Sequence, residues 1–178
     1  MGRNGREEID PISLRLQKHL LQSIGGIHIG FQGEGAIVEG GMAQLRTFWE
    51  SFCSPNGFHL NGDFKKRGHS SFHYRPFTLE SNMYAADALQ EMLLQTRGTQ
   101  VSLFPAIPEQ WNHGSVSFTG FRGENGLVVS AALEDGQLRS LRLRSEKPQR
   151  ITLSHPSLRD GQMTVRLEPQ ADQTYDFN

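Results

Sequence analysis

Glu80 is the residue whose type and position point most clearly to a functional site. It lies just before an apolar repeat of helical spacing, in the segment PFTLESNMYAADALQEMLLQTRG that starts at Pro76. The free backbone N–H groups and the dipole at a helix N-terminus favour the charged form of a carboxylate. The position therefore suits an anionic site residue. The alternative interpretation is that Glu80 only caps the helix.

The sequence gives little support for a metal or a cofactor. His69 and His73 have the four-residue spacing of two ligands on one helix, but the residues between them lack the glutamate of a zinc-protease helix. The single cysteine, Cys53, excludes an internal disulfide and a thiolate cluster, and we expect it to be a small buried side chain. The glycines between residues 25 and 41 fit neither a dinucleotide nor a P-loop spacing. We therefore expect no metal and no cofactor.

Three segments in the first half of the chain show the spacing of three and four residues that is typical of helices. The first follows an Asp-Pro pair and ends at Gly25-Gly26, and the second runs from Met42 to Phe52. In the third, we expect Ser81 to cap the helix and Gly98 to end it as a left-handed residue. The expected buried face of this third helix consists of Ala85, Ala86, Leu89, Met92 and Leu93.

In the second half of the chain the apolar period falls to two residues, which is typical of strands. Turn sequences separate the strands at Asn125-Gly126, Asp135-Gly136 and Asp160-Gly161. Several short strands at this spacing predict an antiparallel sandwich or a curved sheet. The alternating apolar residues are Val101, Leu103, Val116, Phe118, Leu127, Val129, Ala131, Leu141, Leu143, Ile151, Leu153, Met163, Val165, Leu167, Tyr175 and Phe177.

The order of helices first and strands second predicts an α+β fold. We expect a helical part over residues 1–98 and a β-sandwich over residues 99–178. The loops between the predicted helices are long for a small domain, so we expect them either to line a site or to pack against further protein.

Composition excludes several classes of partner. The chain has 178 residues, 36% of them hydrophobic and 21% charged, and a net charge of −1. It lacks the basic excess of a nucleic-acid-binding protein and an apolar run long enough to cross a membrane. The first residues, MGRNGREEIDP, contain no apolar signal-peptide segment. We therefore expect no nucleic acid and no membrane as partner.

The segment from His73 to about Arg144 resembles the C-terminal end of glycoside hydrolase family 95, the inverting α-L-fucosidases and related α-L-galactosidases. Two stretches carry the resemblance, PFTLESNMYAADALQEMLLQT and SLFPAIPEQWNHGSVSFTGFRGENGLVVSAAL. Family members have a Pro-Phe, a short strand, an acidic residue, an asparagine and a helix containing Glu-Met-Leu-Leu-Gln. A Leu-Pro-Ala-x-Pro-x-x-Trp segment follows, which corresponds to Phe104–Trp111, and then Gly114-Ser115-Val116 and Arg122-Gly123.

This resemblance implies a specific architecture. The helices would be the last ones of an (α/α)6 barrel, and the strands would form the β-domain that follows the barrel. The long loops would then line a sugar pocket at one end of the barrel. We therefore expect the chain to be the C-terminal fragment of a longer enzyme, whose other barrel helices precede Met1. The resemblance implies a periplasmic or secreted location for that enzyme.

The resemblance also assigns a role to Glu80, which occupies the position of the family's acidic residue. In the fucosidases that residue is an aspartate, which works with asparagine partners to activate the attacking water. Here Glu80 is followed by Ser81 where the family has glycine and by Met83-Tyr84 where it has Phe-Gly, whereas Asn82 matches. A glutamate can replace the aspartate if the backbone lies about one methylene further away, because an inverting base leaves room for a water beside the sugar.

Polar residues before this helix are candidates for substrate binding, with Asn82. If their loop faces the barrel mouth, His73 and Arg75 can bind sugar hydroxyls or lower the pKa of the nearby carboxylate. His59, Asn61 and Asp63 alternate, so a strand would direct all three to one side, next to aromatic residues that can face a sugar. The alternative for these three is an ordinary solvated loop.

The function that the resemblance implies is inverting hydrolysis of an α-L-fucoside-like glycan by the intact enzyme, with Glu80 as general base. The chain alone would be inactive, because one carboxylate cannot act as both acid and base, and the acid would lie upstream. The partners would be a glycan and the N-terminal part of the barrel.

Two alternatives remain open. In the first, the β-half is a non-catalytic carbohydrate-binding module, which requires exposed coplanar aromatic rings, here Trp111, Phe118 and Phe121. In the second, Glu80 only caps a helix and the β-domain supports a barrel. A large exposed apolar surface on the helices would favour the fragment over a self-sufficient module.

Overall fold

The computed structural model describes residues 42–60, 62–69, 71, 73, 75, 77 and 79–177. The chain divides into two compact units, Met1–Ala88 and Leu89–Asn178. The first predicted helix and Asn61 lie outside the described residues. Within the described part, no helix has the length and hydropathy needed to span a bilayer.

The second predicted helix is confirmed in the first unit. Residues 42–47 form an α-helix that continues into a π-helical turn, η1 (Phe48–Phe52). Leu45, Phe48 and Phe52 are buried at the expected spacing. The Thr47 hydroxyl donates to the carbonyl of Ala43 at 2.9 Å, a contact within the helix that often bends it. The helix therefore changes its winding at the residue that follows Thr47.

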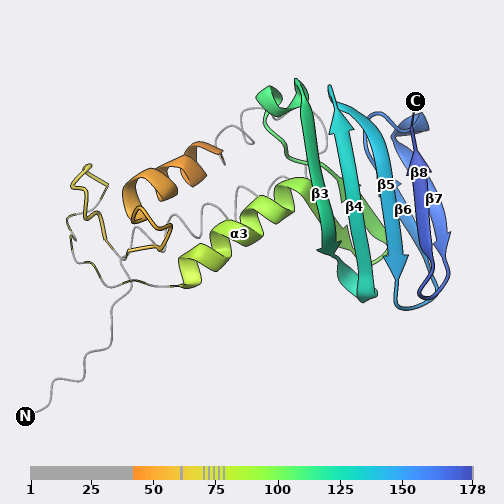
Figure 1. Ribbon diagram of the computed structural model, residues 1–178, viewed down its shortest axis with the longest axis horizontal. Coiled ribbons are helices and arrows are strands. Elements are labelled where there is room, and N and C mark those ends of the chain that lie inside the picture. The colour runs from red at the N-terminus through yellow and green to blue at the C-terminus, as the bar shows by residue number, and fades with distance from the viewer. Residues whose placement is uncertain are drawn as a thin grey trace, which may run out of the picture. The chain divides into compact units, whose positions relative to one another are not determined.

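The third helix, α3 (Glu80–Leu93), differs from the prediction at both ends (Figure 1). The N–H of Met83 donates to the carbonyl of Leu79 at 3.1 Å, so the helix starts two residues earlier than a cap at Ser81 requires. Ser81 lies inside the first turn and is buried. The expectation that Ser81 caps the helix is therefore wrong.

At its other end, α3 stops at Leu93, and the next four residues form strand β1 (Leu94–Arg97). The expectation of a helix to Gly98 is wrong, because β1 pairs with the strand that follows it, from Leu94↔Leu103 to Arg97↔Gln100. Gly98 does adopt a left-handed conformation (φ 57°), but in the turn of this hairpin. The buried residues of α3 are Ser81, Ala85, Ala88, Met92 and Leu93, whereas Ala86 is exposed.

The second unit is a sandwich of two four-stranded sheets (Figure 1). One sheet has the order β1-β2-β6-β7 and the other β3-β4-β5-β8. Pairing is antiparallel except between β2 and β6, which run parallel. The strands after β1 are β2 (Gln100–Leu103), β3 (Ser115–Arg122), β4 (Leu127–Glu134), β5 (Gln137–Ser145), β6 (Gln149–Ser154), β7 (Gln162–Leu167) and β8 (Asp172–Asp176).

Alternating apolar residues fill the space between the two sheets, as the period of two residues predicts. Along β4, for example, Leu127, Val129, Ala131 and Leu133 are all at most 3% exposed. Short 3₁₀ turns connect the strands at η2 (Glu109–Asn112), η3 (Glu124–Gly126) and η4 (Arg159–Gly161).

The three predicted turn sequences form the expected tight turns. Asn125, Asp135 and Asp160 each have a positive φ, between 48° and 57°, and each is followed by a glycine with φ near 70°. Two successive left-handed residues match the twist of paired strands, which explains the Asn-Gly and Asp-Gly sequences. The predicted α+β fold with a β-sandwich-like C-terminal part is confirmed.

Candidate functional site

The Glu80 carboxylate lies at the start of α3 on an exposed residue. Its helix position gives it a favourable interaction with the positive end of the dipole. Among the described residues, no hydrogen bond or ion pair is found for this carboxylate. The Glu80 carboxylate is therefore accessible to solvent and can act as a hydrogen-bond acceptor.

Asn82 holds the first turn of α3 against the loop that ends at His59. Its Oδ1 accepts from the backbone N–H of His59 at 2.8 Å, and its Nδ2 donates to the carbonyl of Gly57 at 2.8 Å. Both ends of the amide are thus bonded to backbone groups that lie far away in sequence. This arrangement fixes the direction in which the first turn of α3, including Glu80, leaves the loop.

His59 lies inside the first unit, where it is 1% exposed. Its ring stacks on Phe48, with ring centroids 5.3 Å apart, and is tilted against Phe52. Next to it, Cys53 is buried as expected, and its burial raises the pKa of the thiol to about 11. A thiol with this pKa stays protonated at neutral pH, so Cys53 behaves as a small apolar side chain.

Asp63, which is fully buried, organises the loop that leads to His73. Its two carboxylate oxygens accept from the backbone N–H groups of Arg67 and His69, each at 2.9 Å. Its carbonyl accepts from Lys66 N at 3.0 Å and contacts Nδ1 of His73 at 2.8 Å. The loop therefore folds around a central carboxylate.

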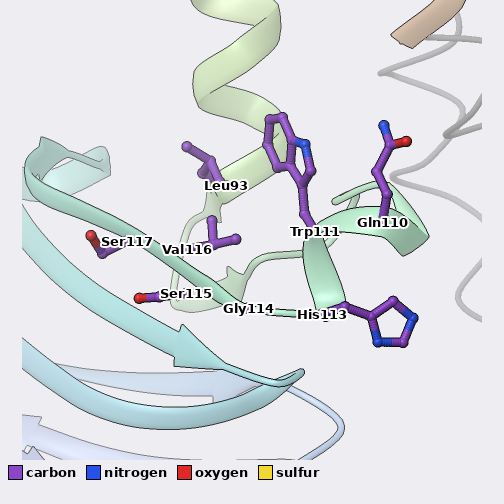
Figure 2. A pocket seen from close by; sticks show the side chains of 8 residues that line it. All are labelled: Leu93, Gln110, Trp111, His113, Gly114, Ser115, Val116 and Ser117. Atoms are coloured by element: carbon purple, nitrogen blue, oxygen red, sulfur yellow. The ribbon is translucent and has the colours of Figure 1, made fainter.

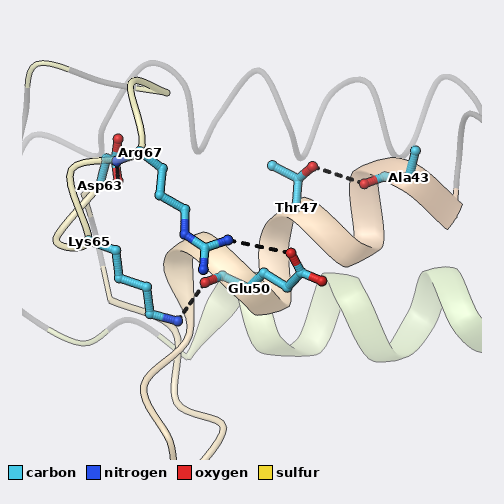
Figure 3. Close-up of polar contacts among 6 residues, drawn as sticks. All are labelled: Ala43, Thr47, Glu50, Asp63, Lys65 and Arg67. Carbon is cyan, nitrogen blue, oxygen red and sulfur yellow. Dashed lines mark hydrogen bonds and ion pairs between the residues drawn. The ribbon is translucent and has the colours of Figure 1, made fainter.

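Two contacts fasten this loop to η1 (Figure 3). The Lys65 ammonium donates to the carbonyl of Glu50 at 2.5 Å, and the Arg67 guanidinium lies 3.4 Å from the Glu50 carboxylate. The ion pair is about half exposed on both sides, so its own contribution to stability is small. Its structural consequence is that the loop 63–69 has a fixed position against the helix within the first unit.

The candidate site residues fall into two pairs of contacts. Asn82 meets the backbone of His59, and His73 meets the backbone of Asp63. His73 and Arg75 are both exposed, and the Arg75 guanidinium lies over the ring of Phe64, 5.5 Å from its centroid. Within the described residues, none of the interactions found for His73 or Arg75 reaches Glu80. The roles expected for these residues in substrate binding stay predictions.

Large apolar side chains are exposed around the start of α3. Phe77 is 62% exposed and Met83 64%, and the Phe77 ring packs edge-on against Phe58. Isolated exposed apolar residues are common, but a group of this kind often marks an interaction surface. Here it comes from one helical turn and its neighbouring loop: Phe58, Phe77, Leu79, Met83 and Tyr84, with Trp49 exposed on η1.

The β-unit contains a second candidate site, a shallow pocket of about 580 Å³ beside Trp111 (Figure 2). It is formed where α3 ends, where η2 carries the tryptophan, and where β3 begins. Trp111 was named from the sequence as a candidate aromatic residue, but the polar residues around it were not. These residues could have been found because they lie directly beside Trp111 in the sequence. The lining residues are Leu93, Gln110, Trp111, His113, Gly114, Ser115, Val116 and Ser117.

The three aromatic residues of the binding-module alternative do not form an exposed face. Phe118 is 5% exposed, and its ring stacks on Phe121 with centroids 4.7 Å apart and lies tilted against Phe104 with centroids 5.2 Å apart. Phe121 and Trp111 are partly buried and pack on the core of the sandwich. The expectation of an exposed Phe118 is therefore wrong, whereas Trp111 borders the pocket described above.

Comparisons with known proteins show what the β-unit is similar to. Residues 95–178 match the model described as glycoside hydrolase family 95, C-terminal domain. A similar protein is alpha-L-fucosidase 2 of Arabidopsis thaliana, which is 36% identical over 73 residues. These residues are 40% of this chain but only 8% of the relative's length. Glu80 and Asn82 precede the residues that the family model matches.

Proposed function

Because residues 95–178 match the model of the C-terminal domain of glycoside hydrolase family 95, we propose that this chain is one part of a glycoside hydrolase. In the complete enzyme, Glu80 acts as the general base for inverting hydrolysis of an α-L-fucoside-like glycan. The observation that carries the proposal is the exposed Glu80 carboxylate at the start of α3, held in direction by Asn82.

The chemistry of inversion explains what Glu80 would do. An inverting enzyme needs one carboxylic acid that protonates the leaving oxygen and one carboxylate that activates water on the other face of the sugar. The Glu80 carboxylate would remove a proton from that water as it attacks the anomeric carbon. A carboxylate that is accessible to solvent at a helix N-terminus can fill this role.

The general acid would come from a helical part outside this chain. In the loop before α3, Asp63 is unsuited to donate a proton, because both of its oxygens accept from backbone N–H groups. The match with the Arabidopsis relative covers 8% of that protein, which is consistent with an enzyme much larger than this chain. We propose that the remaining helices of an (α/α)6 barrel supply the acid and the asparagine partners.

The exposed apolar group at α3 supports this assembly. Phe77, Leu79 and Met83 are each between 45% and 64% exposed, and burial of such side chains stabilises an interface by roughly 25 cal/mol per Å². In the proposal, helices of the barrel cover this surface. They thereby bring the general acid to the same end of α3 as Glu80.

The proposal is tested by joining the chain to the helical region encoded directly upstream of it. The joined protein is assayed with aryl α-L-fucosides and α-L-galactosides, and the first anomer released is identified by NMR. We expect hydrolysis with inversion in the joined protein and none in the chain alone. Hydrolysis by the chain alone that Glu80→Gln abolishes would contradict the need for a second part.

A matched control separates catalysis from a general loss of charge. Asp87 is an exposed carboxylate on the same helix, two turns after Glu80. Glu80→Gln should reduce kcat by at least about 10²-fold, in the range of general base catalysis. Asp87→Asn should leave kcat within about twofold, because this carboxylate lies beyond the first turn. Equal effects of both changes would contradict the assignment of Glu80.

A further inference from the structure

The pocket beside Trp111 joins an aromatic ring, two aliphatic side chains and several polar groups, and the proposed role of Glu80 makes no use of it. We propose that this pocket is a binding subsite for a neutral saccharide, with Trp111 as the surface on which a sugar ring stacks. The choice of a saccharide rests on the proposed function. The pocket's volume of about 580 Å³ is in the range of small-molecule sites.

Trp111 is held in place by its own turn and by the core. Its backbone N–H donates to the carbonyl of Pro108 at 2.9 Å, within the 3₁₀ turn η2. The indole packs on the hydrophobic core of the sandwich and is only partly exposed. A large ring that is already fixed loses little conformational freedom when a ligand binds, which favours recognition by stacking.

Two aliphatic side chains extend the apolar surface next to the indole. In Figure 2, the side chains of Leu93, at the end of α3, and Val116, on β3, are drawn on the same side of the indole of Trp111. Leu93 is 9% exposed and belongs to the core, so this part of the pocket is rigid. Pyranose rings carry C–H groups on one face and hydroxyls at the rim. This combination suits a surface with an apolar centre.

The polar groups of the pocket are able to both donate and accept hydrogen bonds. Gln110 and His113 are exposed lining residues on either side of Trp111 in the sequence, whereas Ser115 and Ser117 point away from the indole, on the side of β3 opposite Val116 (Figure 2). A hydroxyl of a sugar needs donors and acceptors, and an amide and an imidazole provide both. In addition, β3 is at the edge of its sheet among the described strands, so one side of its backbone is paired with none of them. These groups can take the place of water around a bound sugar.

The lack of charged side chains in the lining determines which class of sugar the pocket favours. The lining residues include no aspartate, glutamate, lysine or arginine. A sulfated sugar or a uronic acid would bring a negative charge to a pocket without a cationic partner. The pocket therefore favours a neutral saccharide over an acidic one.

The two tryptophans of the chain allow a direct test. Trp49 lies in η1 of the first unit, so Trp49→Phe leaves Trp111 as the single indole in the full-length chain. Its fluorescence is titrated with methyl α-L-fucopyranoside, methyl α-L-galactopyranoside and glucuronic acid. We expect a saturable change with at least one neutral sugar and a weaker one with the acid. The proposal is overturned if neither neutral sugar causes a saturable change in fluorescence, or if glucuronic acid binds with a lower dissociation constant than the neutral sugars.

Two sets of variants check that the signal comes from this pocket. Gln110→Ala and His113→Ala, in the Trp49→Phe chain, should each raise the dissociation constant by about 2- to 10-fold, because each removes one hydrogen-bonding group. Both side chains are exposed, so neither change should prevent folding. Unchanged binding in both variants overturns the proposal. In the chain with Trp111→Phe, the remaining Trp49 should show no response, and a response would place the ligand elsewhere.

Glu80→Gln separates this subsite from the proposed catalytic residue. Binding at Trp111 should be unchanged by Glu80→Gln, whereas a loss of binding would place the sugar at Glu80 and overturn the subsite. Hydrolysis by the joined enzyme without any response of Trp111 contradicts only the subsite. A response of Trp111 in a joined enzyme that does not hydrolyse contradicts only the proposed function.

Discussion

The backbone N–H of His59 donates to the Oδ1 of Asn82 at 2.8 Å, although the two residues lie 23 positions apart. The other end of the same amide donates to the carbonyl of Gly57. Through this pair of contacts, the turn that follows η1 fixes the position and direction of the first turn of α3. Any role of Glu80 in chemistry depends on this contact, because a catalytic carboxylate must be held within a fraction of an ångström of its working position.

Asn82→Ala should therefore destabilise the first unit. The change removes two hydrogen bonds at a partly buried site, and each is worth about 0.5–1.5 kcal/mol. We expect a loss of about 1–3 kcal/mol in the free energy of unfolding, measured with urea. Asp87→Ala on the exposed face of α3 is the matched control and should change stability by less than about 0.5 kcal/mol. Equal stability of the Asn82→Ala chain and the unmodified chain would show that the amide is dispensable.

The strand pattern of the second unit could be predicted from the sequence because its sheets have one buried face. Alternation of apolar and polar residues over β4 and β5, and the Asn-Gly and Asp-Gly turns, identify these elements without tertiary information. Strand β1 could not be predicted in this way. Leu94 to Arg97 continue the helical repeat of α3, and only their pairing with β2 makes them a strand.

The candidate site was predicted less well than the fold. Polar residues near Glu80 can be named from the sequence, but their contacts run between segments that the sequence does not place together. Asp63 is an example, because an acidic residue in a loop is usually exposed. Here it is fully buried and binds two backbone N–H groups of the loop that follows it. No local pattern distinguishes this aspartate from a solvated one.

Two arginines of like charge face each other in the second unit. Arg150 and Arg166 are directly paired across β6 and β7, and both are exposed. Like charges in opposed positions destabilise an antiparallel pair by roughly 0.2–1 kcal/mol. Arg150→Glu should therefore increase the free energy of unfolding by about this amount in 20 mM salt, with a smaller gain in 500 mM salt because ions screen exposed charges.

The matched control for this change is Arg159→Glu in the turn η4, which is exposed and alters the net charge by the same amount. It should not reproduce the salt-dependent gain in stability. Destabilisation by Arg150→Glu, or the same gain in both variants, would argue against repulsion between the paired arginines.

His155 should make the second unit sensitive to acid. It is 5% exposed, and burial lowers the pKa of its ring to about 4. Nδ1 accepts from the backbone N–H of Ser157 at 3.2 Å, which also requires the unprotonated nitrogen. Because the unfolded chain binds the proton more readily, stability is complete above pH 6.5 and is lost as pH falls from 6.5 to about 4. The expected loss is on the order of 1–3 kcal/mol.

The measurement is urea unfolding of the chain at pH 7.5 and at pH 5. His155→Asn keeps an acceptor near the position of Nδ1 but cannot titrate, so the difference between the two pH values should shrink. His113→Asn, which alters an exposed histidine in the same unit, should leave the difference unchanged. An unaltered pH difference in the His155→Asn chain would assign the acid sensitivity to other groups.

The Arg122-Gly123 pair, which contributed to the family resemblance, has a steric explanation in the sandwich. A β-carbon at Gly123 would lie 2.5 Å from Cγ2 of Thr96, at the end of β1. The Thr96 hydroxyl accepts from the N–H of Glu124 at 3.0 Å, and Glu124 accepts from the N–H of Gly98 at 2.6 Å. The glycine thus allows the turn after β3 to approach the β1–β2 hairpin closely enough for these bonds.

Gly123→Ala should destabilise the chain by about 1–3 kcal/mol, the usual cost of forcing an extra carbon into a packed contact. Thr96→Ser removes the clashing methyl group and keeps the hydroxyl that accepts from Glu124, so it should be nearly neutral by itself. In the double variant, most of the loss should be recovered, because the closest contact is removed and the remaining contacts of the new β-carbon, with Oγ1 and Cβ of residue 96, are 3.2 and 3.3 Å. A double variant as unstable as Gly123→Ala alone would show that the backbone, rather than the Thr96 methyl group, requires glycine.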